Sequence, residues 1–254
     1  MSVLQVKNAV KSFGSLRAVA GASFVLEQGD NLAIVGESRC GKTTLAKMMM
    51  GLLKLDEGSI TVEKHSIQMV FQDPYQSLDP LWNVREILKE ALWREINGDV
   101  YQLKLNGKTI GRRHHLLKAQ AQKKMEQMVT AVGLTPQVLQ RFPHEFSGGE
   151  RQRIAIARAL LASPKILILD EAVSALDTLV QQQIIDLLKR LKKEFNLTYI
   201  FISHNLRLVR NFSDKIAVMY KGKIVEEGQA KAVLESPKHP YTKQLLQAAF
   251  YKNL

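Results

Sequence analysis

The sequence predicts an α/β fold into which a helical segment is inserted. Short strands that alternate apolar and polar residues open the chain at Leu4–Ala9 and Ala22–Leu26. Helical spacing with few β-branched residues marks Ile87–Glu95 and Leu116–Val132. After Ser147, helical segments alternate with short apolar strands, which favours a largely parallel sheet with flanking helices.

The composition is that of a soluble globular protein with a substantial core. Hydrophobic residues make up 46% of the chain and charged residues 24%. No run approaches the roughly 18 apolar residues that cross a bilayer, and the first residues lack the features of a signal peptide. A single cysteine, Cys40, fits a reducing cytoplasm. The formal charge of +12 favours an anionic partner: a nucleotide, a nucleic acid or a membrane surface.

A phosphate-binding loop is predicted where the apolar run Leu32–Val35 meets the helical segment Thr43–Leu53. The loop matches the pattern G-x-x-x-x-G-K-[ST] and reads Gly36-Glu37-Ser38-Arg39-Cys40-Gly41-Lys42-Thr43. Its backbone N–H groups can surround phosphate oxygens at a helix N-terminus. Lys42 would reach the β- and γ-phosphates, and the Thr43 hydroxyl would bind Mg²⁺. The sequence therefore predicts a nucleotide site.

Two neighbouring acids follow a second apolar strand. Ile166–Leu169 is followed by Asp170 and Glu171, and ligands gather at the carboxyl ends of strands in open α/β sheets. Asp170 suits outer coordination of Mg²⁺, and Glu171 could polarise the water that attacks a γ-phosphate. Taken alone, such a strand is more often a core strand that ends in two solvated acids. The phosphate loop upstream favours the catalytic interpretation.

A second glycine-containing helix start is predicted at residues 147–150, which read Ser147-Gly148-Gly149-Glu150. Backbone N–H groups and a hydroxyl at a helix start again suit phosphate, although a lone Ser-Gly-Gly usually marks only a turn. One chain does not need two anion sites for a single γ-phosphate. The economical interpretation is a dimer, in which this loop covers nucleotide held by the partner chain.

Several motifs together resemble a known family over essentially the whole chain. They are Gly36–Thr44, Gln72, Ser147–Gln152, Asp170-Glu171, Ser174–Asp177 and His204. In order and spacing they are similar to the ATP-binding-cassette (ABC) ATPases. That resemblance implies a P-loop NTPase core of RecA type, with an N-terminal antiparallel β subdomain and an inserted α-helical subdomain. We predict a single domain, in which residues 1–73 and 147–254 form the nucleotide-binding core and residues 74–146 the helical subdomain.

The resemblance also implies roles for individual residues. Phe13 would stack on adenine, although it could equally belong to the core. Gln72 would sense Mg²⁺ and couple to a permease. His204, which in isolation could be structural, would contact the γ-phosphate and orient Glu171. The nucleotide would be bound by residues 36–44, by the signature loop Ser147, Gly148, Gly149 and Glu150, and by Asp177.

Several positions depart from the family pattern, two of them in the predicted nucleotide-binding loops. Arg39 stands where the family usually has glycine, and Glu150 replaces a common glutamine. If the backbone at Arg39 needs a positive φ, its side chain costs on the order of 1 kcal/mol. We therefore expect Arg39 to weaken nucleotide binding without abolishing it.

The segments Ile67–Pro80 and Glu235–Thr242 look like those of oligopeptide, dipeptide and nickel importers. This likeness implies an ATP-hydrolysing subunit that binds ATP and Mg²⁺ and lies peripherally on the cytoplasmic face of the bacterial inner membrane. Its partners would be a second ABC ATPase subunit and two membrane permease subunits. An extracytoplasmic substrate-binding protein would be an indirect partner.

Two other functions stay open. The basic stretch Leu103–Lys124 contains seven Lys or Arg and no acid; it is most simply a solvated helix face, and contact with anionic lipid headgroups beside a permease, or with nucleic acid, is the alternative. The high net charge would suit a soluble ABC ATPase acting on nucleic acid or ribosomes. The single cassette argues against this, and no specific nucleic acid partner is predicted. Arg39 would suit a catalytically weak nucleotide-binding partner in a heterodimer, whereas Glu171 and His204 favour hydrolysis.

Overall fold

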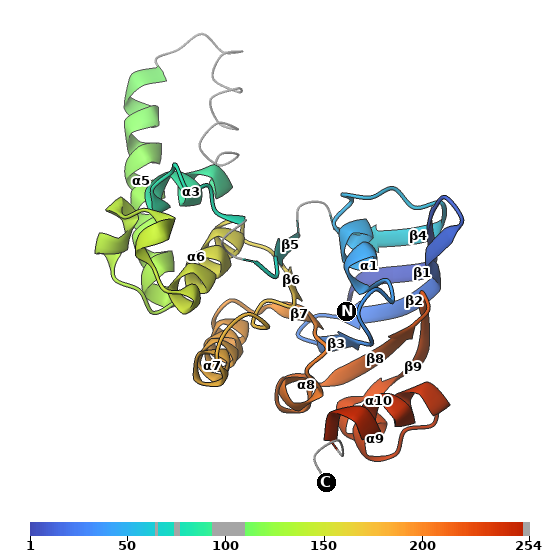
Figure 1. The fold of residues 1–254 in the computed structure, drawn as a ribbon. Helices are drawn as coiled ribbons and strands as arrows, with labels where there is room; N and C mark the ends of the chain where they lie inside the picture. The colour runs from blue at the N-terminus through green and yellow to red at the C-terminus, as the bar shows by residue number, and fades with distance from the viewer. Residues whose placement is uncertain (64–65, 74–76, 93–109, 251–254) are drawn as a thin grey trace. The chain divides into compact units, whose positions relative to one another are not determined.

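The computed structural model describes residues 1–63, 66–73, 77–92 and 110–250, with the backbone alone for residues 110–118 (Figure 1). The chain divides into two compact units. The first comprises Met1–Gln72, Lys165–Ser174 and Leu188–Leu254, and the second Asp73–Pro164 and Ala175–Leu187. The second unit thus takes in parts of the chain that we assign to the nucleotide-binding core, and that functional division stays a prediction. Most of the basic stretch Leu103–Lys124 lies outside the residues whose side chains are described.

An antiparallel sheet opens the first unit. Its strands are β1 (Ser2–Phe13), β2 (Leu16–Glu27) and β4 (Glu57–Val62), in the spatial order β2-β1-β4. The predicted strands Leu4–Ala9 and Ala22–Leu26 lie within β1 and β2, and the observed strands are longer than predicted. Buried and less buried residues alternate along much of β2, because one face of the sheet packs on the core.

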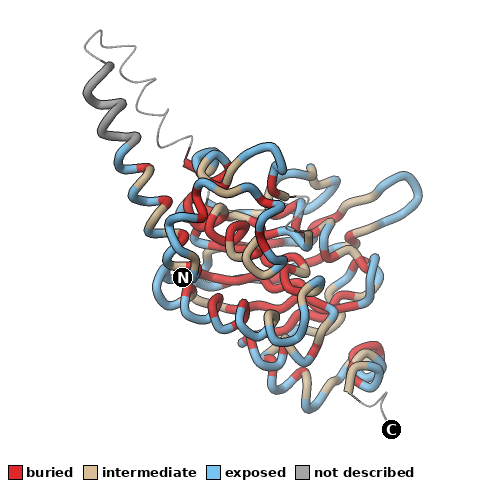
Figure 2. The backbone as a smooth tube through the Cα atoms, turned by 60° about the vertical axis from the view of Figure 1, so that its left-hand side comes forward, coloured by how far each residue is buried: buried red, intermediate tan, exposed pale blue. Residues whose placement is uncertain are grey.

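The second sheet of the first unit is mostly parallel. In spatial order its strands are β5 (Ile67–Val70), β6 (Ile166–Asp170), β7 (Thr198–Ile202), β3 (Asn31–Val35), β8 (Lys215–Tyr220) and β9 (Lys223–Gln229). All pairs are parallel except β8–β9, an antiparallel hairpin. Every residue of β3, β6 and β7 is buried, and buried stretches run through the tube in Figure 2. Strands buried on both faces read as continuous apolar runs, which is the pattern that predicts them.

The described part of the first unit contains helices α1 (Lys42–Met49), α8 (Leu206–Phe212), α9 (Ala230–Glu235) and α10 (Pro240–Phe250), together with the last part of α7 (Thr178–Glu194). Helix α1 contacts β2 and β4 of one sheet and β6 of the other. Leu45 and Met49 of α1, Val6 of β1 and Ile168 of β6 consequently belong to one buried cluster. This shared core joins the two sheets around the helix that follows the phosphate loop.

The second unit is built from helices. They are α3 (Val84–Ala91), α5 (Ile110–Ala131), the 3-10 turns η1 (Pro136–Gln140) and η2 (Pro143–Glu145), α6 (Gly148–Leu161) and the first part of α7 (Thr178–Glu194). Helix α6 packs against α3 and α5. Arg158 of α6 donates a hydrogen bond to the Ser77 carbonyl. None of the described helices is long and apolar enough to cross a membrane.

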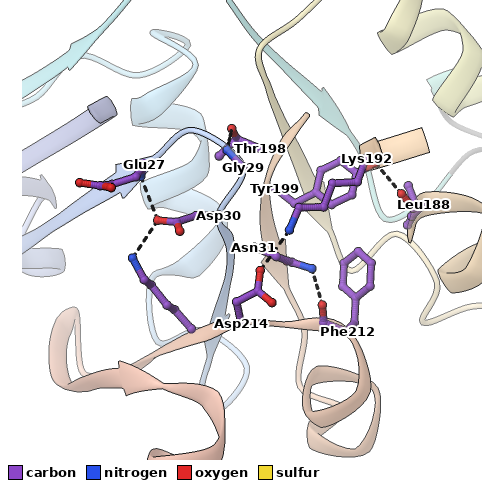
Figure 3. A network of polar contacts seen from close by, with 11 residues as sticks. Glu27, Gly29, Asp30, Asn31, Leu188, Lys192, Thr198, Tyr199, Phe212 and Asp214 are labelled. Atoms are coloured by element: carbon purple, nitrogen blue, oxygen red, sulfur yellow. Dashed lines mark hydrogen bonds and ion pairs between the residues drawn. The ribbon is translucent and has the colours of Figure 1, made fainter. Parts of the chain in front are cut away.

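A polar network ties the amino ends of the central strands together (Figure 3). The Asp30 carboxylate accepts hydrogen bonds from Lys215 Nζ and from the Glu27 amide, both at 2.9 Å. The buried Tyr199 hydroxyl donates to the Leu188 carbonyl at 2.9 Å, and burial raises the pKa of Tyr199. The network fixes the end of the sheet opposite the phosphate loop.

Replacing Tyr199 with Phe removes the hydroxyl and leaves the ring stacked on Phe212. We expect the free energy of unfolding to fall by about 1 kcal/mol, because one buried hydrogen bond is lost while the packing stays. Urea denaturation measures the change. Tyr220→Phe is the control, since Tyr220 lies at the sheet's other end. An equal loss in both variants would contradict the assigned role of the buried hydroxyl.

Candidate nucleotide site

The phosphate loop follows β3 and has no room for side chains at two of its glycines. A Cβ at Gly36 would lie 2.2 Å from the Met219 carbonyl oxygen, and one at Gly41 would lie 2.2 Å from that of Ala18. Both glycines also have positive φ values, 151° and 111°. The loop is therefore pressed against β8 and β2, and only glycine fits at these points.

Hydrogen bonds hold the Lys42 side chain across the loop. Its ammonium donates to the carbonyl oxygens of Gly36 at 2.9 Å and Glu37 at 2.7 Å, and the side chain is buried. Cys40 Sγ lies 3.6 Å from the same Nζ. Burial raises the pKa of the Cys40 thiol, so this group is neutral near pH 7 and packs as a small apolar side chain. The positive charge of Lys42 is thus placed at the loop, where the pattern predicts phosphate.

Asp170 and Thr43 form the part of the site that suits a cation. Asp170 ends β6, and its side chain is buried beside the Thr43 hydroxyl, with which it is hydrogen-bonded. Burial, together with the neighbouring Glu171, raises the pKa of the Asp170 carboxyl, while the Thr43 hydrogen bond and Lys42 lower it. Asp170 Oδ1 has no hydrogen-bond partner among the described residues. Oxygen atoms of this kind are the ligands that Mg²⁺ prefers, so the residues present fit that ion.

No group of three His, Cys, Asp or Glu residues in the described part of the chain is arranged to hold a metal by itself. Mg²⁺ at phosphate-transfer sites is bound by one or two carboxylates together with substrate phosphates and water. A single buried carboxylate next to a threonine hydroxyl at the phosphate loop meets that requirement.

Glu171 and His204 face one another beside the loop. Glu171 Oε2 lies 3.3 Å from His204 Nδ1, and the two residues follow the neighbouring strands β6 and β7. Glu171 has a φ of 49°, and its amide donates to the Ile202 carbonyl at 2.9 Å. The left-handed turn directs the carboxylate across to the next strand. His204 is 55% exposed, so its other ring nitrogen can reach a ligand.

Parallel pairing brings most of the predicted first-unit residues to one edge. The loop Gly36–Thr44 follows β3, Gln72 follows β5, and Asp170, Glu171 and His204 lie at the ends of β6 and β7. Gln72 is exposed and follows β5 by two residues. Phe13 ends β1 on the other sheet and is 49% exposed, with Lys11 Nζ 5.8 Å from its ring centre. An exposed ring leaves Phe13 free to stack on a ligand.

The second unit holds the remaining predicted residues. Ser147 caps α6: its Oγ accepts from the Glu150 amide at 3.3 Å, and Glu150 Oε2 accepts from the Ser147 amide at 2.9 Å and from its hydroxyl at 2.8 Å. These bonds lower the pKa of Glu150. A Cβ at Gly149 would lie 2.6 Å from Val180 Cγ1, and Asp177 Oδ1 accepts from the Val180 amide at 3.0 Å. The signature loop and Asp177 therefore meet at the start of α7.

Arg39 has the left-handed backbone that its departure from the family pattern anticipates. Its φ is 67°, and its side chain is exposed. A side chain in this region is strained, whereas glycine adopts it freely. The phosphate loop therefore contains one strained residue between its two glycines.

The chain is similar to several known proteins along most of its length. The family model described as "ABC transporter" matches residues 19–174. The oligopeptide transport ATP-binding protein OppF of Haemophilus influenzae is 44% identical over 249 residues, which cover 92% of this chain and 70% of that protein. The di/tripeptide transport ATP-binding protein DppF of Pseudomonas aeruginosa is 40% identical over 253 residues, covering 94% and 73%.

A solved structure is similar along nearly the whole chain. It is an ATP-binding cassette of an ABC transporter in its ADP conformation, with a TM-score of 0.75 and 27% identity, and the match covers 96% of this chain and 98% of that one. The α/β fold class, with an antiparallel sheet beside the P-loop core, is therefore confirmed.

Replacing Arg39 with Gly relieves the positive-φ strain. We expect the free energy of unfolding to rise by about 1 kcal/mol and the affinity for ADP to increase. Urea denaturation and ADP titration measure the two effects. Arg39→Ala is the matched control, because it removes the guanidinium but keeps a Cβ at the same φ. If the alanine variant gains as much as the glycine variant, backbone strain is not the cause.

Proposed function

Because this chain belongs to the ABC transporter family of ATP-binding proteins, we propose that it is the ATP-hydrolysing subunit of a bacterial importer for oligopeptides or dipeptides. The single observation that carries hydrolysis is the pairing of Glu171 with His204, 3.3 Å apart, beside the phosphate loop. The peptide transport names of the relatives support peptides as the transported class. They favour peptides over nickel or metal chelates, which the sequence left open.

ATP would be held by the loop amides and by Lys42, with Phe13 against the adenine. Thr43 and Asp170 would hold Mg²⁺, with Gln72 also contacting it, and the ion when bound would neutralise charge on the β- and γ-phosphates. Glu171 would polarise the attacking water, and His204 would keep the Glu171 carboxylate oriented towards it. Such catalysis is mostly positioning and electrostatic stabilisation, which suits residues held at strand ends.

A second ATPase subunit would complete each site. The start of α6 carries backbone N–H groups that suit an anion, as the start of α1 does, while the Ser147 hydroxyl is bound to Glu150. Ser147, Gly148 and Gly149 would therefore cover nucleotide held by the partner chain, with Glu150 and Asp177 at the same contact. Two identical subunits and two different ones would both fit this division of the site.

Two membrane permeases would be the direct partners on the cytoplasmic face of the inner membrane, and a substrate-binding protein outside the membrane would act through them. Beyond Gln72, the second unit exposes two large apolar side chains in succession, Leu81 at 82% and Trp82 at 42%. Exposed apolar residues of this size are typical of a protein contact. We assign them to the permease contact.

The two alternative functions have less support. An ATPase acting on nucleic acid or ribosomes rests on net charge alone. A catalytically weak partner rests on Arg39, whereas the contact between Glu171 and His204 and the position of Lys42 in the loop support hydrolysis.

Replacing Glu171 with Gln tests hydrolysis. We expect the ATPase rate to fall about 10²- to 10⁴-fold with nucleotide affinity retained, because the amide cannot accept a proton from water. Glu194→Gln, at the exposed end of α7, is the matched control and should keep the full rate. Equal rates in wild type and Glu171→Gln would contradict the catalytic role.

The substrate class is tested in vesicles containing the permeases. Stimulation of the ATPase rate by nickel and not by peptide would contradict the proposed substrate class.

A further inference from the structure

The C-terminal helix contacts the phosphate loop through one tyrosine. The Tyr241 hydroxyl, near the start of α10, accepts a hydrogen bond of 3.0 Å from the backbone N–H of Glu37. The Tyr241 side chain is buried, so the hydroxyl is directed inward to the loop. The sequence indicated this segment only as one similar to importers, and no pattern in it predicted a contact some two hundred residues away along the chain.

Tyr241 is itself held in place from two sides. Its ring stacks on Tyr220, the last residue of β8, with 4.0 Å between ring centres and an angle of 29° between the planes. Glu226 of β9 accepts hydrogen bonds from the amides of Lys238 at 2.8 Å and His239 at 3.0 Å, just before α10. The Tyr241 amide in turn donates to His239 Nδ1 at 3.1 Å. The Tyr241 ring and the start of α10 are therefore anchored to the β8–β9 hairpin, and this anchoring fixes the position of the hydroxyl.

The same hairpin holds the other end of the loop. The Gly222 amide, in the turn between β8 and β9, donates to the Cys40 carbonyl at 3.0 Å, and the Met219 carbonyl lies against Gly36. Between these supports lies Arg39 with its φ of 67°. A strained backbone persists only where its surroundings over-determine it. Tyr241 at Glu37 and Gly222 at Cys40 supply that support on either side of Arg39.

We propose that Tyr241 is a positioning residue for the phosphate loop and that it couples the C-terminal helix α10 to nucleotide binding. By holding the Glu37 amide, Tyr241 fixes the peptide planes that follow it, whose N–H groups meet the phosphates. Tyr241 contacts the loop and not the reacting atoms. Its loss weakens binding in the ground state and the transition state alike, which raises KM and leaves kcat unchanged.

Coupling between two sites is reciprocal. If α10 supports the loop, bound nucleotide must also stabilise the docking of α10. ADP should then slow hydrogen exchange of the backbone amides in residues 241–246. A residue that only contributes to overall stability would not link these two parts of the chain.

The test compares Tyr241→Phe with Tyr220→Phe in the full chain. The first variant removes the hydroxyl that binds Glu37 and keeps the ring stack, and the second removes the other hydroxyl of the same stack. We expect Tyr241→Phe to weaken ADP binding about two- to tenfold, the effect of losing one hydrogen bond, and Tyr220→Phe to leave it unchanged. Titration with ADP measures both.

Two further readouts separate positioning from general destabilisation. Tyr241→Phe should raise the KM for ATP with kcat retained, and should abolish the ADP-dependent slowing of exchange in α10. An unchanged ADP affinity in Tyr241→Phe, or an equal loss in Tyr220→Phe, would overturn the proposal. So would a fall in kcat at constant KM. The inference rests on nucleotide binding alone, so ADP titration tests it even if the chain proves not to drive import.

Discussion

The site depends on the parallel pairing of β3 with β7 on one side and β8 on the other. β3 is buried along its whole length, and its neighbours run in the same direction. All their carboxyl ends therefore lie at one edge, which places the phosphate loop beside Glu171 and His204 from distant parts of the sequence. The polar network around Asp30 secures the opposite edge, so the register that aligns the site is held at both ends.

Two of the described non-glycine residues with positive φ values lie in the candidate site, whereas others, such as Asn8 and Asn196, lie outside it. Arg39 and Glu171 both have positive φ values, one in the phosphate loop and one at the end of β6. A backbone hydrogen bond to a distant residue holds each turn. The Glu171 amide donates to the Ile202 carbonyl, and the carbonyl of Cys40, next to Arg39, accepts from the Gly222 amide. Rigid strands and a hairpin maintain these turns, which would be unfavourable in an isolated peptide. The end of β7 and the turn between β8 and β9 thus supply the hydrogen bonds that hold these two turns.

The sequence predicted those features that local pattern determines. The apolar runs of β3 and β6, the loop pattern and the helix that follows it are continuous in the chain, and their residues meet as expected. The β8–β9 hairpin and the short helices α8, α9 and α10 were not predicted, because brief segments carry little periodicity. Tyr241 could not be assigned to the site at all. Its partner is a backbone amide, which leaves no signal in side-chain identity.

The two helix starts offer the same backbone groups in different electrostatic settings. At α1, Lys42 adds a positive charge to the N–H groups, and Asp170 with Thr43 supplies oxygen atoms for a cation. At α6, the third helical position is Glu150, whose carboxylate already accepts both the amide and the hydroxyl of Ser147. A negative charge there offsets the positive end of the helix, so this start is poorly suited to hold a triphosphate alone. It is suited to close over a nucleotide whose charge is already neutralised elsewhere, which is what a dimer with one complete phosphate loop in each subunit requires.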